Sequence, residues 1–167
     1  DGVIDSNDQA PIGYNPVPEM TFSLAAGLNW KGIDFSILFQ GAARSSIYLQ
    51  QDIAWDNFWG NYYEEHIGRW TPETAATATY PRFTKAATAT HPNYYKSDYW
   101  LKDSKYLRLK NIQLGYTIPR KLLKKIGIRS LRVYTNAYNL LTWDNVKKVD
   151  PESPNNSNGQ FYPQQKV

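Results

Sequence analysis

The chain has 167 residues, enough for one ordinary domain with a sizeable core, and a mild formal net charge of +4. Cysteine is absent, which excludes disulfide frameworks and thiolate metal sites. No run approaches the roughly 18 consecutive apolar residues that a membrane helix needs, so a helical membrane protein is excluded. A membrane β-barrel stays possible, because the alternating residues of its strands average out in hydropathy.

The first eight residues, "DGVIDSND", follow the pattern of the second half of an EF-hand-like calcium loop. The candidate ligands of a structural calcium ion are Asp1, Val3, Asp5 and Asp8, with Gly2 at the turn and Ile4 as the apolar pin. The leading acids of such a loop would lie upstream, so we expect this chain to be a segment of a longer protein. Loops of this kind also persist as metal-free turns, and calcium binding is therefore a hypothesis.

A β-hairpin is predicted over residues 20–41. The stretch "TFSLAAGLNW" alternates strictly, a two-residue "KG" turn follows, and "IDFSILFQG" resumes the alternation. Each arm is close to the roughly 9 to 11 residues with which a tilted strand crosses a bilayer. One face of the hairpin collects Phe22, Leu24, Ala26, Leu28, Trp30, Ile33, Phe35, Ile37 and Phe39.

Two environments fit this hairpin. A soluble β-sandwich would turn the apolar face into a core and the polar face to water. A membrane barrel would turn the apolar face to lipid and the small polar residues to its lumen, with Trp30 at the interface. The hairpin alone leaves both open.

The connections favour the barrel. Residues 42–100 show no sustained periodicity, and so long a loop is unusual inside a compact soluble domain but ordinary on the outside of an outer-membrane barrel. Two further strands are predicted in region 101–143, at 106–118 and 130–143. Leu107 and Ile112 lie on opposite parities of the first, so we expect a bulge near Lys110 and Asn111 to restore the register.

A short connection joins these two strands at 119–129. Pro119 opens it, one helical turn is expected inside it, and Gly127 closes it. The polar stretch 144–167 follows the second strand. Connections that alternate between short and long are typical of an up-and-down membrane barrel.

Several motifs now carry a family resemblance. "YLRLKNIQLGYTIP" (106–119), "LRVYTNAYNLLTW" (131–143) and the later "DPE" resemble the C-terminal barrel signature of SusC/RagA-type transporters, the TonB-dependent outer-membrane proteins of Bacteroidetes. "DGVIDSND" with "PIG", "FQG" near residue 40 and "RWTPE" (69–73) are further matches in the expected order.

The resemblance implies an all-β fold, an antiparallel transmembrane β-barrel. This chain would supply about four C-terminal strands of a plugged barrel of roughly 22 strands. Residues 1–19, 42–100 and 144–167 would be extracellular loops, the turn at 119–129 would be periplasmic, and a last strand would lie beyond residue 167.

The resemblance also implies a function. The complete protein would lie in the outer membrane of a Gram-negative bacterium, in contact with its lipid, and would not be an enzyme. It would import oligosaccharides or oligopeptides together with a SusD-like surface lipoprotein. The TonB complex would drive import through parts of the protein outside this chain.

Aromatic residues in the long loop are the candidates for contact with cargo or partner, because exposed rings stack on sugars and anchor protein interfaces. The alternative is that they form the small core that orders the loop. The candidates are Trp55, Trp59, Tyr62, Tyr63 and Trp70.

Little else indicates chemistry. Glu64, Glu65 and His66 invite a metal or acid–base interpretation, but no second histidine stands at helical spacing. Residues 102–132 hold ten Lys or Arg against one acid, which we interpret as solvated charge at the barrel rim rather than a nucleic-acid site.

Two other classes stay open at this point. A calcium-stabilised, carbohydrate-binding β-sandwich would use the same hairpins and aromatic residues and would be soluble without detergent. A secreted glycan hydrolase would need a pair of carboxylates, for which Glu64 with Glu73 or Asp56 are the candidates.

Overall fold

The computed structural model describes residues 2, 6–56, 62–85, 91–146 and 149–152. Its main feature is a four-stranded antiparallel sheet in the order β1-β2-β5-β6. The strands are β1 (Met20–Trp30), β2 (Ile33–Ala43), β5 (Tyr106–Thr117) and β6 (Arg132–Asp144). The predicted hairpin and the two later strands are therefore present, within a few residues of the expected bounds.

Short elements make up the rest. A second sheet pairs β3 (Ser46–Tyr48) with β4 (Leu101–Asp103). The helical turns are η1 (Ser6–Asp8), η2 (Gln51–Ile53), η3 (Glu64–Gly68), η4 (Pro92–Tyr94), α1 (Arg120–Leu123) and η5 (Lys124–Ile126). No helix among the described residues is long and apolar enough to cross a membrane.

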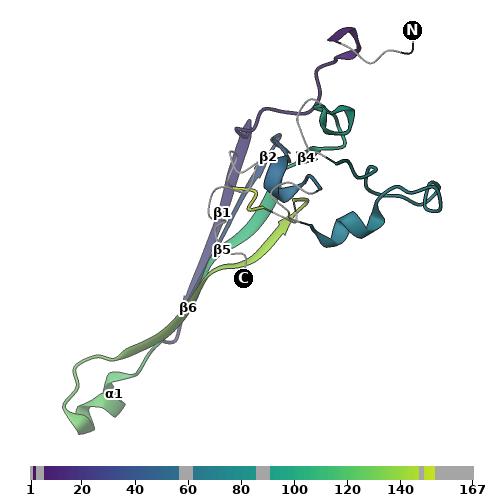
Figure 1. The fold of residues 1–167 in the computed structure, drawn as a ribbon. Helices are drawn as coiled ribbons and strands as arrows, with labels where there is room; N and C mark the ends of the chain where they lie inside the picture. The colour runs from purple at the N-terminus through teal and green to yellow at the C-terminus, as the bar shows by residue number, and fades with distance from the viewer. Residues whose placement is uncertain (1, 3–5, 57–61, 86–90, 147–148, 153–167) are drawn as a thin grey trace.

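The molecule is elongated (Figure 1). Both short connections of the large sheet, at 31–32 and at 118–131, lie at one end, and the N-terminal residues and long loops lie at the other. Lys31 and Gly32 both have positive φ, 47° and 88°, as a tight hairpin turn requires. The helical part of the second connection ends at Gly127, whose φ of 72° caps η5 as predicted.

The predicted bulge is confirmed at Lys110. Leu38 and Phe39 of β2 are adjacent, but they pair with Asn111 and Leu109 of β5, so Lys110 is an extra residue there. The pairing of β5 with β6 shifts at the same place. The bulge returns the apolar residues on either side of it to a common face.

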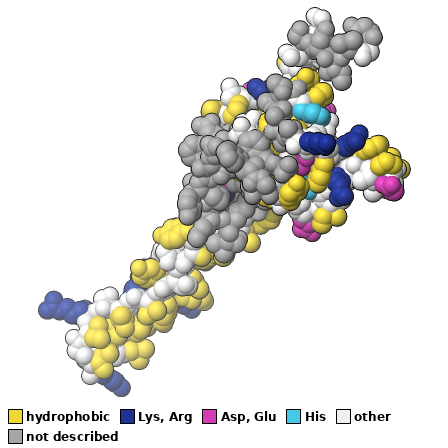
Figure 2. Space-filling model, in the orientation of Figure 1, with side chains coloured by type: hydrophobic (Ala, Val, Ile, Leu, Met, Phe, Trp, Pro, Cys, Tyr) yellow, Lys and Arg dark blue, Asp and Glu magenta, His cyan; other side chains and the backbone are white. Residues whose placement is uncertain are grey.

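One face of the large sheet is continuously apolar. Between its ends, each row of paired residues across the four strands is apolar except at Thr135. These rows contain Leu24, Ala26, Leu28, Phe35, Ile37, Phe39, Leu109, Ile112, Leu114, Thr135, Ala137 and Leu141. Figure 2 shows hydrophobic side chains gathered along the part of the sheet that lies away from the loops.

Aromatic residues rim this apolar face at both ends. Phe22 and Trp143 belong to the last row on the loop side, and Trp30 and Tyr116 to the last row on the side of the short turns. The eight-residue step from Phe22 to Trp30 covers about 26 Å at ~3.3 Å per residue. A strand tilted by ~40° would then give a height of ~20 Å, close to the ~25 Å apolar band of outer-membrane barrels.

The opposite face is polar and carries a cross-strand ion pair. Arg132 of β6 reaches over β5 to Asp34 of β2, with Nε 2.9 Å from Oδ1 and a second bond from Nη2 to Oδ2. Gly115 of β5 lies beneath the pair, and a Cβ there would come within 2.5 Å of both Arg132 and Asp34. Glycine at this position is what allows the pair to form.

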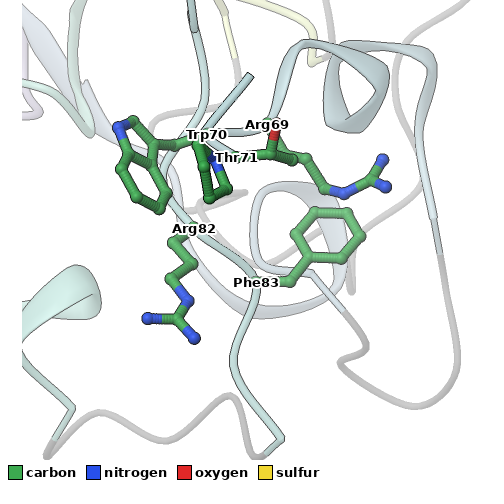
Figure 3. A pocket seen from close by; sticks show the side chains of 6 residues that line it. Arg69, Trp70, Thr71, Arg82 and Phe83 are labelled. Atoms are coloured by element: carbon green, nitrogen blue, oxygen red, sulfur yellow. The ribbon is translucent and has the colours of Figure 1, made fainter. Parts of the chain in front are cut away.

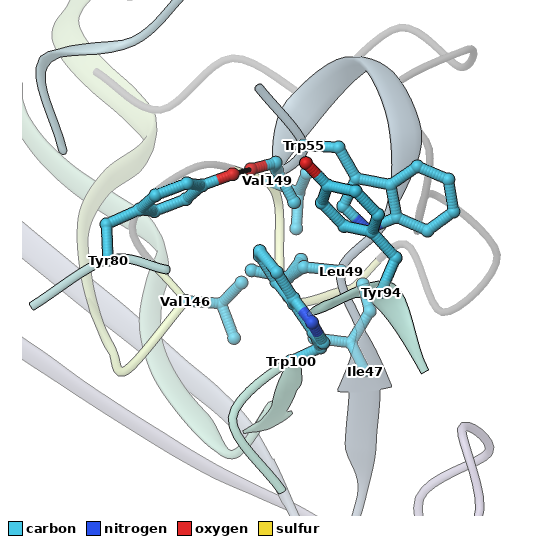
Figure 4. Packing of buried hydrophobic residues seen from close by; sticks show 9 residues of the cluster. Ile47, Leu49, Trp55, Tyr80, Tyr94, Trp100, Val146 and Val149 are labelled. Carbon is cyan, nitrogen blue, oxygen red and sulfur yellow. Dashed lines mark hydrogen bonds between the residues drawn. The ribbon is translucent and has the colours of Figure 1, made fainter. Parts of the chain in front are cut away.

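The long loops pack together into one unit and do not project separately from the sheet. Their apolar core consists of Ile47, Leu49, Ala54, Trp55, Tyr80, Tyr94, Trp100, Val146 and Val149 (Figure 4). Val146 and Val149 follow β6, while the other members lie between β2 and β5. We refer to residues 44–105 and 145–152 together as the loop unit.

A buried ion network fastens the loop unit to the sheet. Arg108 of β5 is fully buried and donates through Nη2 to both carboxylate oxygens of Asp150, at 2.9 Å each. Its Nη1 lies 2.5 Å from Glu152 Oε2, and its Nε donates to Thr142 Oγ1 at 2.9 Å. Lys110 bonds both oxygens of Glu152 at 2.9 Å, so two cations face two carboxylates.

This network corrects one expectation. Arg108 belongs to the basic run that we interpreted as solvated rim charge, and for Arg108 that interpretation is wrong. Its partners, Asp150 and Glu152, lie more than forty residues away in the sequence and were not recognised as such. The turn residues Lys121, Lys124 and Lys125 are exposed.

The replacement of Arg108 by Met should release the loop unit from the sheet. It leaves Asp150 buried without a cation, and loss of one partner of a buried pair costs about 3 to 5 kcal/mol. In the intact protein, hydrogen exchange of residues 144–152 should accelerate strongly, while the middle of β1 and β2 keeps its protection. The matched control is Arg129→Met, at an exposed position; equal exchange in both variants would contradict the fastening role.

The polar face gives a second prediction. Gly115→Ala should displace the Asp34–Arg132 pair and lower stability by about 1 kcal/mol, the lower end of overpacking costs. Gly27→Ala, on the same face, is the control, because a Cβ there would lie 3.5 Å from its nearest neighbour, an ordinary contact. The measurement is the thermal unfolding midpoint of the intact protein in detergent. A midpoint for Gly115→Ala no lower than that for Gly27→Ala would show that the pair is not constrained by this glycine.

Candidate ligand-contact surface of the loop unit

The aromatic core of the loop unit is braced by buried polar groups. Asp56 is fully buried, and its carboxylate accepts hydrogen bonds from Tyr94 Oη, from Tyr80 Oη at 3.4 Å and from the Thr84 N–H at 3.1 Å. Tyr80 also donates to the Ala54 carbonyl at 2.8 Å (Figure 4). Burial, followed by the nearby Asp56 carboxylate, raises the pKa of both Tyr80 and Tyr94 well above the usual value. Asp56 is therefore a structural acceptor, enclosed too deeply to act as a hydrolytic carboxylate.

His66 is likewise satisfied within the core. Its Nδ1 accepts from the Tyr63 N–H at 3.1 Å, so Nε2 carries the proton that faces the Ala54 carbonyl at 3.2 Å. The rings of Tyr62, Tyr63, Tyr80 and Phe83 surround it. Both ring nitrogens are in use, and Glu64 and Glu65 are exposed beside it. Among the described residues no cluster of His, Asp and Glu could hold a metal ion.

An open hollow lies on the surface above this core (Figure 3). It has a volume of about 340 Å³ and is lined by Arg69, Trp70, Thr71, Pro72, Arg82 and Phe83. The guanidinium of Arg69 lies over the Phe83 ring, 5.1 Å from its centroid. Phe83 packs in turn on His66 and Tyr80, so the hollow rests on the aromatic core.

The backbone around the hollow is held by local hydrogen bonds. Trp70 N–H donates to the Tyr80 carbonyl at 2.9 Å, next to a bridge between Arg69 and Tyr80. Thr71 and Thr74 close the following turn, with the Thr71 N–H 2.8 Å from Thr74 Oγ1. These bonds hold the "RWTPE" stretch on the core and turn the indole of Trp70 outward, where 38% of the residue is exposed.

The predicted contact residues separate into different roles. Trp55 is 3% exposed and belongs to the core, so for this residue the packing alternative applies. Tyr62 is 57% exposed, and Tyr63 is half-buried against His66. Trp59 lies outside the described residues. The structure therefore leaves Tyr62 and Trp70 as the candidates with accessible rings.

Sequence reasoning missed three members of the hollow. Arg69, Arg82 and Phe83 were not singled out, although "RWTPE" was recognised as a motif. The available signal was the recurrence of an Arg next to an aromatic residue at 69–70 and at 82–83. The fold brings the two pairs together through the bridge between Arg69 and Tyr80 and the stacking of Arg69 on Phe83.

No family model matches the chain. It is 32% identical over 160 residues to the TonB-dependent receptor P26 of Formosa agariphila, and 29% identical over 152 residues to the TonB-dependent receptor P3 of the same organism. These alignments cover 93% and 91% of this chain but only 15% and 14% of the relatives, so the chain spans about a seventh of their length.

Solved structures agree on the fold. The structure of the RagAB peptide importer in the open-open state matches 92% of this chain and 16% of its own, with a TM-score of 0.68 and 22% identity. The structure of the RagAB peptide transporter gives the same TM-score at 21% identity. The chain is a segment of a TonB-dependent receptor. The four long strands of this receptor segment accordingly belong to an antiparallel barrel wall.

Three of the four candidate calcium ligands lie outside the part of the chain that the structure describes. They are Asp1, Val3 and Asp5, and Asp8 ends the helical turn η1. Calcium binding at these four positions stays a prediction from the sequence.

The Asp56 brace of the receptor segment gives a third prediction. Asp56→Ala removes the acceptor of two buried hydroxyls and one N–H, and an unsatisfied buried group costs about 1 to 3 kcal/mol. With a loss of about 2 kcal/mol, hydrogen exchange of the stretch 91–104 should be roughly 30-fold faster in the intact receptor. Glu64→Ala, an exposed carboxylate of the same unit, is the control. Unchanged protection in Asp56→Ala would show that the aromatic packing alone holds the loop unit.

Proposed function

We propose that the intact protein is an outer-membrane active transporter that imports oligosaccharides or oligopeptides. A SusD-like surface lipoprotein would close over the cargo, and the TonB complex would supply the energy through parts outside this chain. No bond of the cargo is made or broken in this process. The names of the relatives support transport, while the cargo and the partners go beyond what this segment contains.

The observation that carries the proposal is the apolar face of the large sheet. Its large side chains stay accessible, with Leu24, Leu28 and Leu114 each about half exposed or more. A β-sandwich would cover this face with a second sheet, and the described residues place none there. Lipid contact explains why so many apolar side chains remain uncovered between two aromatic rims.

The placement of short and long connections at opposite ends of the sheet supports one orientation of the strands in the membrane. The short turns at 31–32 and 118–131 share one end of the sheet, and outer-membrane barrels place short turns in the periplasm. The loop unit would then face the medium. There its accessible aromatic residues, Tyr62 and Trp70, would meet the cargo or the lipoprotein.

Cysteine labelling tests this arrangement, because the chain has no Cys of its own. In a cysteine-free version of the intact receptor, Glu73→Cys in the loop unit should react on whole cells with a membrane-impermeant maleimide. Lys125→Cys, in the turn at the other end, should react only after the outer membrane is permeabilised. Leu28→Cys should react with a lipid-soluble maleimide and resist the aqueous one.

The same strains provide the functional control. Cells that lack the receptor gene should lose energy-dependent uptake of a saccharide or peptide that wild-type cells import, and the labelled variants should restore it. Reaction of Lys125→Cys on whole cells would refute the orientation, and uptake that persists without the gene or without TonB would refute the transport role.

A further inference from the structure

The hollow of the loop unit contains two arginines that pair with no carboxylate among the described residues. Throughout the described part of the chain, the ion pairs join Arg44, Lys105, Arg108, Lys110 and Arg132 to acids, and neither Arg69 nor Arg82 is among them. Both residues are exposed at the rim of the hollow. A pair of uncompensated guanidinium groups in one cavity attracts an anion.

Both guanidinium groups project from anchored positions. Arg69 is stacked on Phe83 and follows η3, where its N–H donates to the His66 carbonyl at 3.2 Å. The carbonyl of Arg82 accepts from Asn93 Nδ2 at 2.8 Å, while its side chain lines the same hollow as Trp70 (Figure 3). The backbone is thus fixed and the charged ends are left for a ligand.

Along residues 69–72 the hollow offers side chains rather than a backbone edge. The N–H groups of Arg69, Trp70 and Thr71 are all used within the loop unit, and Pro72 has none. An extended peptide would need such groups to pair along its main chain. A sugar ring needs only a flat aromatic face, which Trp70 provides, and a volume of about 340 Å³ is within the usual range of small-molecule sites.

From this arrangement we propose that the hollow is a binding subsite for an acidic saccharide. Trp70 stacks on a sugar ring, and Arg69 and Arg82, whose guanidinium groups lie on opposite sides of the hollow (Figure 3), each bind a carboxylate of a uronic acid or a sulfate ester. The inference rests on the proposed transport function and narrows its cargo to anionic glycans. It assigns a substrate class to residues of this chain.

Binding to the purified intact receptor in detergent tests the subsite. Calorimetry would use three oligosaccharides of equal length: a galacturonate oligomer, a sulfated galactan oligomer and a neutral glucan oligomer. One or both acidic oligomers should bind, the neutral one at least 10-fold more weakly. Affinity for the acidic oligomer should fall with added salt, because the contacts are charged. The acidic oligomer that binds identifies the anionic group.

Variants assign the effect to the hollow. Arg82→Gln, an exposed side chain with no hydrogen bond or ion pair to the described residues, should weaken acidic binding about 10-fold, and Arg69→Gln with Arg82→Gln together about 100-fold or more. Trp70→Ala should weaken it as well. Arg129→Gln, an exposed arginine at the far end of the sheet, is the matched control and should bind like the wild type.

Several results would overturn the subsite. They are equal affinity for neutral and acidic oligomers, no binding of any oligomer, wild-type affinity in the double variant, or a hexaglutamate peptide that binds the hollow when the saccharides do not. Because binding is measured on purified protein, these results would leave the labelling and uptake experiments unaffected. A receptor that transports but ignores acidic saccharides would refute this inference alone.

Discussion

The burial of Arg108 is the constraint on which the loop unit depends. A guanidinium without solvent must have its hydrogen bonds and its charge satisfied by the protein, and Asp150, Glu152 and Thr142 do both. The carboxylates come from the segment after β6, while the arginine comes from β5. That segment is therefore drawn back over the sheet, and Val146 and Val149 enter the core formed by buried residues between Ile47 and Trp100.

The two faces of the large sheet differ in character, one apolar and one polar. The alternation of side chains gives one face a continuous apolar surface, and the bulge at Lys110 preserves it where the parity of the sequence breaks. The same bulge puts Lys110 next to Glu152 in the ion network. One extra residue in β5 thus serves both the continuity of the apolar face and the attachment of the loop unit.

The strands could be predicted from sequence because their signal is local. Period-two alternation identified 20–41, and the change of parity between Leu107 and Ile112 identified the bulge. The packing of the loop unit could not be predicted, since its core residues follow no period. Trp55 and Tyr62 look alike in sequence, yet one is 3% and the other 57% exposed. Trp55 packs against Tyr94 and Tyr62 packs against Phe83, and only the folded chain brings these partners near.

Arginine shows why residue type alone could not assign the roles. Arg108, Arg132 and Arg69 all stand next to aromatic rings, at 5.6, 4.8 and 5.1 Å from the centroids of Tyr106, Tyr134 and Phe83. Arg108 and Arg132 are neutralised by carboxylates from other strands or loops, so they hold the fold together. Arg69 has the same aromatic support, but no acid in the described part of the chain pairs with it. An arginine that the fold positions and leaves electrically uncompensated is arranged for a partner that brings its own negative charge.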